Sequence, residues 1–179
     1  MFICLRQVDL HRRFGIPRVA FLSLVTFIIT FMVSFEIMYY FLDHPLTDRY
    51  FLFFVIAFAG VYPIHKLCHL ILFIPYYKSF RCYRLSHRPW LPFYNVYINT
   101  PIWKPLFCLG LLAPLIIITP ICIYLAQTFP SYGHYYMFIM SLNFGCAVLD
   151  LLYLKLILFS TKGKFIEEYQ TGLAILDKK

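Results

Sequence analysis

The fold is decided by residues 51–77, FLFFVIAFAGVYPIHKLCHLILFIPYY, an apolar stretch that is long enough to cross a lipid bilayer as a helix. Its two histidines lie within the segment His65-Lys66-Leu67-Cys68-His69. Histidines four residues apart face the same side of a helix, which is a spacing that lets both imidazoles bind one zinc ion. Lys66 stands where a metallopeptidase carries the glutamate that serves as general base. The stretch therefore predicts a membrane helix with two metal ligands and without the catalytic carboxylate.

The composition of the whole chain indicates an integral membrane protein. Of its 179 residues, 61% are hydrophobic and only 13% are charged, whereas soluble domains are about one quarter charged. A water-soluble domain of this size has too little interior to bury so much apolar surface. We expect a single integral membrane domain over residues 1–179, with an all-α fold. Its four transmembrane helices are predicted at about residues 19–42, 51–77, 106–129 and 135–160.

Two segments outside the predicted helices favour β-structure. Residues 81–88 and 93–98 are rich in strand-forming residues and are separated by prolines, so they predict a β-hairpin in the long middle loop. Residues 165–176 predict one or two short strands around Gly172. The expected fold is therefore a four-helix membrane bundle with a small amount of β-structure beside it.

The distribution of Lys and Arg predicts the orientation in the membrane. With four helices, the N-terminal segment, the middle loop and the C-terminal tail share one side and hold thirteen Lys and Arg residues, whereas the opposite side holds Arg49 alone. The positive-inside rule then places both termini in the cytoplasm of a multi-pass cell-membrane protein. We expect the lipid bilayer as a partner and no nucleic acid, because the net charge of +8 is dispersed along the membrane flanks.

The ionisable residues at membrane depth are the candidate functional residues, because such side chains are costly inside a bilayer. His65 and His69 lie well inside the second predicted helix, and Asp150 lies at a matching depth in the fourth. At 1.5 Å per residue, all three lie about 20–27 Å from the outer surface. Two histidines and one carboxylate with a free fourth position are the ligand set of a catalytic zinc ion. The candidate metal ligands are thus His65, His69 and Asp150, and the candidate cofactor is zinc.

The same residues allow an explanation without a metal. Asp150 can form an ion pair with Lys66 or Lys155, and the histidines can bond to backbone groups or tyrosine hydroxyls. In a metal-free state we expect Lys66 to contact Asp150, because a buried ammonium group needs a carboxylate. We expect an interhelical hydrogen bond from Asn143. Prolines in the third helix, such as Pro114, are expected to bend it and to free backbone carbonyl groups.

These motifs resemble those of a known family. The pair His65-x-x-x-His69, the basic loop with strand character, the proline-containing third helix and Leu149-Asp150 are similar to the zincin peptidases that are small bacterial four-helix membrane proteins. That family, known as a domain of unknown function, is similar in outline to the site-2-type intramembrane metalloproteases. The resemblance runs from about residue 50 to 176, and it implies that His65, His69 and Asp150 are the metal ligands.

Two residues depart from the pattern of that family. Lys66 replaces the glutamate that accepts a proton during hydrolysis, and an ammonium group cannot accept one. Leu151 follows Asp150 where site-2-type enzymes usually have glycine. The resemblance and these departures predict a non-hydrolytic relative, a pseudopeptidase that binds a membrane protein or peptide. Two alternatives stay open: an active zinc metallopeptidase with an unusual base, and a structural or accessory subunit of a membrane transport or export assembly.

Overall fold

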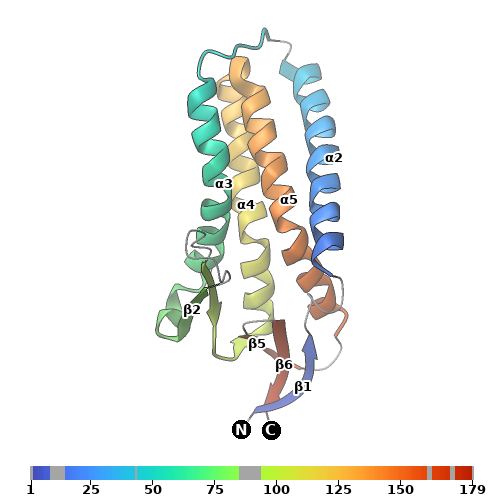
Figure 1. The fold of residues 1–179 in the computed structure, drawn as a ribbon, viewed down its shortest axis with the longest axis vertical. Coiled ribbons are helices and arrows are strands. Elements are labelled where there is room, and N and C mark those ends of the chain that lie inside the picture. Colours follow the sequence, from blue (N-terminus) through green and yellow to red (C-terminus); the bar gives the residue numbers. More distant parts are fainter. Residues whose placement is uncertain are drawn as a thin grey trace.

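The computed structural model of the protein describes residues 2–8, 15–42, 44–84, 94–160, 163–169 and 172–178. Four long helices run side by side as a bundle, and the strands lie toward the end of the bundle at which both chain termini are found (Figure 1). The helices are α2 (Ile16–Leu42), α3 (Phe51–Leu72), α4 (Lys104–Thr128) and α5 (Gly133–Leu158). Each is long and apolar enough to cross a membrane. This confirms the predicted four-helix membrane fold, and the chain is a multi-pass membrane protein.

The outer surface of the bundle is apolar, as contact with lipid requires. In α2 only Met38 is buried, and large side chains such as Phe21 (68% exposed) and Met32 (62% exposed) face outward. In water such a surface would drive aggregation, whereas lipid solvates it without cost. The exposed apolar side chains thus agree with the membrane assignment that the composition predicts.

The helix α5 has contacts with all three other helices and carries two buried polar side chains, Ser141 and Asn143. Gly145 allows α2 to approach it, because a Cβ atom at this position would lie 3.1 Å from the Ser23 backbone oxygen. Small residues permit such close packing in membranes, where no hydrophobic driving force brings helices together. Asn143 of α5 is fully buried, and Asp150 lies about two turns further along the same helix.

The strands form two antiparallel sheets. A four-stranded sheet has the spatial order β1-β6-β5-β4, and a separate hairpin pairs β2 with β3. The hairpin and the C-terminal strands confirm the predicted β-structure, although residues 85–93 of the predicted hairpin lie outside the described residues. The sequence did not predict β1. The strands are β1 (Phe2–Val8), β2 (Phe80–Arg84), β3 (Tyr94–Ile98), β4 (Ile102–Trp103), β5 (Phe165–Tyr169) and β6 (Gly172–Lys178).

The four-stranded sheet is fixed to the ends of the helices by a buried apolar cluster. Ile166 of β5 and Ile175 of β6 lie in one cluster with Phe107 of α4 and Ile157 of α5, and none of these side chains is more than 3% exposed. Burying four such side chains contributes about 1.5–3 kcal/mol each. The sheet is therefore packed firmly against the bundle, which gives β5 a defined position next to the helices.

The helix α3 ends earlier than the sequence predicts. It stops at Leu72 rather than at residue 77, and Ile74–Ser79 form a short 3₁₀ segment. Pro75 has no N–H group to donate to the carbonyl of Ile71, and the loss of this hydrogen bond favours the end of the α-helix here. The shorter helix leaves His69 in the last turn of α3, close to the strands.

Candidate metal centre

The structure brings the three predicted metal ligands together. The Asp150 Oδ2 atom of α5 lies 3.0 Å from His65 Nε2 and 3.3 Å from His69 Nε2, both of α3. The two Nε2 atoms lie 3.2 Å apart. The His65 side chain is 3% exposed, and those of His69 and Asp150 are each 13% exposed. One compact group of two imidazoles and a carboxylate is therefore buried where α3 and α5 meet.

The tautomer of the neutral His65 ring is set by Asn143. The Nδ1 atom of His65 lies 2.8 Å from Asn143 Oδ1, and the Asn143 amide nitrogen donates to the Pro114 carbonyl at 3.1 Å. Because that donation places the amide NH₂ on Pro114, the amide oxygen faces the ring and can only accept. The Nδ1 atom of His65 therefore carries the proton, and in the neutral ring Nε2 presents a lone pair to Asp150 and His69.

His69 is oriented in the same way by the backbone of α4. Its Nδ1 atom lies 2.8 Å from the Gly110 carbonyl oxygen, which is an obligatory acceptor. That carbonyl is available because residue 114, which would normally donate to it, is Pro114 and has no N–H. The predicted freeing of carbonyl groups by proline is confirmed at this position. His69 thus donates through Nδ1, so its Nε2 atom also has a lone pair.

When both rings are neutral, the site therefore presents three acceptor atoms, none of which carries a proton. His65 Nε2, His69 Nε2 and Asp150 Oδ2 lie 3.0–3.3 Å apart, and the three residues offer ligand atoms that all lie within 4.8 Å of one another. Acceptors this close repel one another unless a cation lies between them. Ligand atoms of a tetrahedral zinc at about 2.0–2.2 Å are roughly 3.3–3.6 Å apart. The residues therefore fit a zinc ion with three protein ligands and an open fourth position.

Lys66 does not make the contact that we expected. Within the described part of the chain, Asp150 has its close side-chain contacts with His65 and His69, and no ion pair joins it to Lys66. Position 66 lies about 100° around α3 from His65, so the imidazole and not the ammonium group occupies the direct line to the carboxylate. Lys66 is half-buried and exerts its charge on Glu168 of β5 instead.

Two groups that orient the histidines were not assigned to the site from the sequence. Asn143 was expected to form an interhelical hydrogen bond, which is confirmed, but its role in fixing the His65 tautomer was not foreseen. The Gly110 carbonyl oxygen is a backbone atom, so no residue type signals it. The one available signal was the proline four residues later. Such partners of metal-binding histidines commonly set ring orientation and ligand basicity.

Glu168 is a further carboxylate near the centre that the sequence analysis did not single out. Its Oε2 atom accepts a hydrogen bond from the Ile98 backbone N–H at 3.2 Å. Burial raises its pKa to about 7 from an ordinary value of 4.5, a rise that the Asp150 charge reinforces and that the Ile98 hydrogen bond and the nearby charges of Lys66 and His69 oppose. The carboxylate therefore lies near enough to the centre to interact with it electrostatically.

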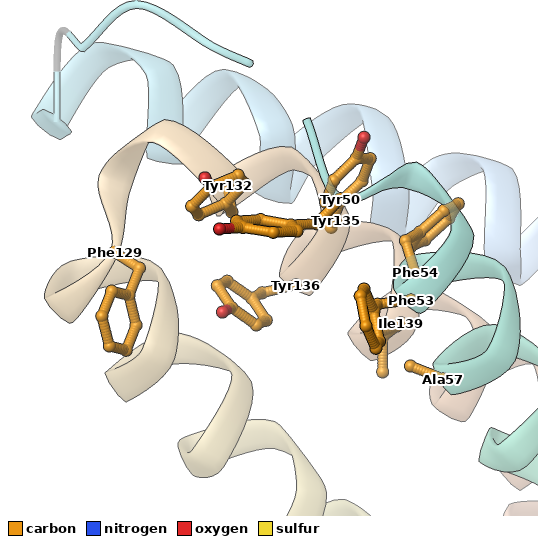
Figure 2. Close-up of a pocket in the computed structure, with 9 residues that line it drawn as sticks. All are labelled: Tyr50, Phe53, Phe54, Ala57, Phe129, Tyr132, Tyr135, Tyr136 and Ile139. Atoms are coloured by element: carbon orange, nitrogen blue, oxygen red, sulfur yellow. The ribbon is translucent and has the colours of Figure 1, made fainter. Parts of the chain in front are cut away.

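A separate hollow of about 340 Å³ lies toward the other end of the bundle. Figure 2 shows tyrosine and phenylalanine rings around it, from the beginning of α3 and the residue before it, the turn between α4 and α5, and the start of α5. Its α3 residue nearest to the metal centre is Ala57, about two turns before His65. Nothing in the lining can bind a metal strongly, so this hollow is distinct from the candidate centre. The lining residues are Tyr50, Phe53, Phe54, Ala57, Phe129, Tyr132, Tyr135, Tyr136 and Ile139.

Comparison with known proteins identifies the family. No curated protein and no solved structure matches the chain. A model of the family described as putative zincin peptidase matches residues 58–165, which include His65, His69 and Asp150. The match covers more than half of the chain and agrees with the resemblance carried by the two histidines and the aspartate. The chain therefore belongs to the putative zincin peptidase family.

Proposed function

We propose that the protein binds one zinc ion through His65 Nε2, His69 Nε2 and Asp150 Oδ2, and that it uses this centre to hold a membrane protein or peptide without cleaving it. The observation that carries the proposal is the set of three lone-pair atoms, 3.0–3.3 Å apart, whose protons are held elsewhere by Asn143 and Gly110. A bound zinc ion would supply Lewis acidity that polarises a carbonyl oxygen of the partner.

The absence of hydrolysis is proposed because of the residue at position 66. A zincin uses a glutamate on the same helix as its histidines to accept a proton from water and to pass it to the leaving amine. Lys66 cannot take that role as an ammonium group, and it also removes a negative charge from beside the metal position. The ligands are thus complete while the helix-borne base is missing, a combination that suits binding better than cleavage.

We also propose that both termini and the strands lie in the cytoplasm. Thirteen Lys and Arg residues belong to the segments on that side, against Arg49 on the other. In the structure His69 lies in the last turn of α3, near the strands, so the centre would be closer to the cytoplasmic surface. A partner would then reach the site from the lipid or from the cytoplasm.

An active peptidase is the second candidate, and one observation favours it. Glu168 holds a carboxylate close enough to Lys66, His69 and Asp150 to respond to their charges. A carboxylate supplied by a strand can in principle accept the proton that the helix position cannot. Cleavage of a membrane peptide would distinguish this candidate from pure binding.

The proposal is tested by measuring zinc in detergent-purified protein. After saturation with zinc and removal of the excess, the wild type is expected to hold about one ion per chain, and Asp150→Asn and His65→Ala are expected to hold much less. A matched control is His134→Ala, which changes a histidine in the first turn of α5, away from the centre. Equal zinc in the wild type and Asp150→Asn would overturn the metal site and leave the structural or accessory role. Cleavage of a helical membrane substrate that requires His65 would overturn the non-hydrolytic part.

A further inference from the structure

The C-terminal sheet places one acidic side chain toward the metal centre and its neighbour elsewhere. Glu167 and Glu168 are consecutive in β5, and successive side chains of a strand point to opposite faces. The Tyr169 hydroxyl donates to Glu167 at 3.1 Å, so Glu167 and Tyr169 share one face. Glu168 lies on the other face together with Ile166, which is buried against Phe107 of α4 and Ile157 of α5. There the charges of Lys66 and Asp150 act on it. Of these two carboxylates, only that of Glu168 therefore lies on the face of β5 toward the centre.

The position of Glu168 is fixed by β6 on one side and by β3 on the other. Residues 165–169 pair with β6, whereas β4 pairs with β5 only at Phe165 and Ile166. Beyond Ile166 that edge of β5 is free of β4, and β3 comes close enough for the Ile98 N–H to donate to Glu168 Oε2 at 3.2 Å. A carboxylate held by a backbone donor on a packed sheet has a defined place, which is what a binding residue needs.

We propose that Glu168 is the second carboxylate of the centre, standing in for the glutamate that α3 lacks at position 66, and that it accepts a hydrogen bond from the water or peptide N–H group at the open fourth position. This inference rests on the proposed zinc site and deepens it. The family match ends at residue 165, so Glu168 lies outside the part of the chain that the match covers.

Charge balance supports this role. A zinc ion beside Asp150 and the Lys66 ammonium group would leave two uncompensated positive charges in a poorly solvated site, and Glu168 removes one of them. Among the described residues, the groups whose charges act on Glu168 are Lys66 of α3 and Asp150 of α5, with His69 of α3 when its ring is protonated. Its pKa of about 7 also suits a group that exchanges a proton or a hydrogen bond near neutral pH.

The test compares the zinc affinity of Glu168→Gln with that of Glu167→Gln, by competition with a chelator at pH 8. The first variant is expected to bind zinc about tenfold more weakly than the wild type, a loss typical of carboxylates around a metal site. The second removes the same charge one residue away on the other face and is expected to bind as the wild type does. At pH 6, where Glu168 is mostly protonated, the wild type and Glu168→Gln are expected to converge.

The outcomes separate this inference from the proposed function. A wild type that binds no zinc overturns the proposed function itself. A wild type that binds zinc through Asp150 but loses nothing in Glu168→Gln, or loses as much in Glu167→Gln, overturns the role of Glu168 alone. Thermal unfolding in the same detergent checks that each variant folds. If Glu168→Gln does not fold, Glu168→Asp and Glu168→Ala replace it, and equal zinc affinity of these two variants also overturns the role.

Discussion

Asn143 Oδ1 lies 2.8 Å from His65 Nδ1, so an amide on α5 decides which nitrogen of a ring on α3 carries the proton. The amide is itself held by the Pro114 carbonyl of α4 at 3.1 Å. Three helices therefore contribute to the orientation of one imidazole. A His65 ring in the opposite tautomer would turn an N–H toward the carboxylate and lose the lone pair that a metal requires.

Replacing Asn143 by leucine is expected to weaken zinc binding at least about tenfold, because the His65 tautomer is no longer fixed. The His65 N–H would also be left buried without an acceptor, at a cost of about 1–3 kcal/mol in stability. Isothermal titration with zinc and thermal unfolding measure the two effects. The matched control is Ser141→Ala, since Ser141 is equally buried but donates to Met137 of its own helix. Unchanged zinc affinity in Asn143→Leu would contradict the orienting role.

Replacing Pro114 by alanine is expected to move stability and zinc affinity in opposite directions. The new N–H restores the helical hydrogen bond to Gly110 and removes a proline from a helix interior, which favours the fold by up to about 3 kcal/mol. The Gly110 carbonyl is then shared with His69, and zinc affinity is expected to fall by up to about tenfold. Pro120→Ala is the control, because the carbonyl that it restores belongs to Ile116, whose side chain is 57% exposed. A Pro114→Ala protein that binds zinc as tightly as Pro120→Ala would argue against this link.

Changing Lys66 to alanine is expected to cost less than about 1 kcal/mol, because its side chain is half-buried and Asp150 already has two imidazole partners. Lys66→Glu restores the zincin pattern and adds a negative charge beside the metal position, so zinc affinity is expected to rise about tenfold. Lys155→Glu makes the same charge change at an exposed position of α5 and serves as control. If Lys66→Ala lowers the free energy of unfolding by several kcal/mol, the result would instead support a direct Lys66–Asp150 ion pair.

The raised pKa of Glu168 predicts how stability depends on pH. The folded protein holds this proton up to about pH 7, whereas the unfolded chain releases it near 4.5. Stability from this group is therefore full below about pH 4.5 and is lost as the pH rises through 7. In metal-free protein, Glu168→Gln is expected to be more stable than the wild type at pH 8 by roughly 1–3 kcal/mol, and nearly equal at pH 5. Chemical unfolding with a chelator present measures this; a wild type as stable as the variant at both pH values would refute it.

Both termini are expected in the cytoplasm. A fluorescent protein joined through a flexible linker after Lys179 should fluoresce in the cell, and alkaline phosphatase placed in the loop at 44–50 should be active outside it. If the fluorescent protein stays dark and the alkaline phosphatase is inactive, the charge distribution does not set the orientation of this chain.

The sequence predicted the parts of the fold that depend on apolar length and on spacing. The four membrane helices and the common depth of the histidines and Asp150 follow from residue counts, because a helix rises a fixed distance per residue. The hairpin and the C-terminal strands were also found from strand-forming residues between turn signals. What these predictions share is that each depends on a local pattern.

The parts that were missed depend on contacts between distant segments. The alternation of apolar and polar residues in β1 is too weak to predict a strand. The strand β1 forms by pairing with β6 from the other end of the chain. Lys66 was expected to contact Asp150, which the two imidazoles contact instead, because depth along a helix does not show which side chain faces the carboxylate. Glu168 was not singled out within the predicted C-terminal strands, and only the packing of β5 brings it near α3.

The strand β6 is an inner strand of its sheet, with β1 on one side and β5 on the other. The last described residues of the chain therefore support the strand that carries Glu168, although they are far from His65 in sequence. A protease that trimmed the chain just after Tyr169 would leave all three proposed zinc ligands in place and yet release Glu168 from its position. Preparations of this protein should accordingly be checked for an intact C-terminus by mass spectrometry before any zinc measurement is compared.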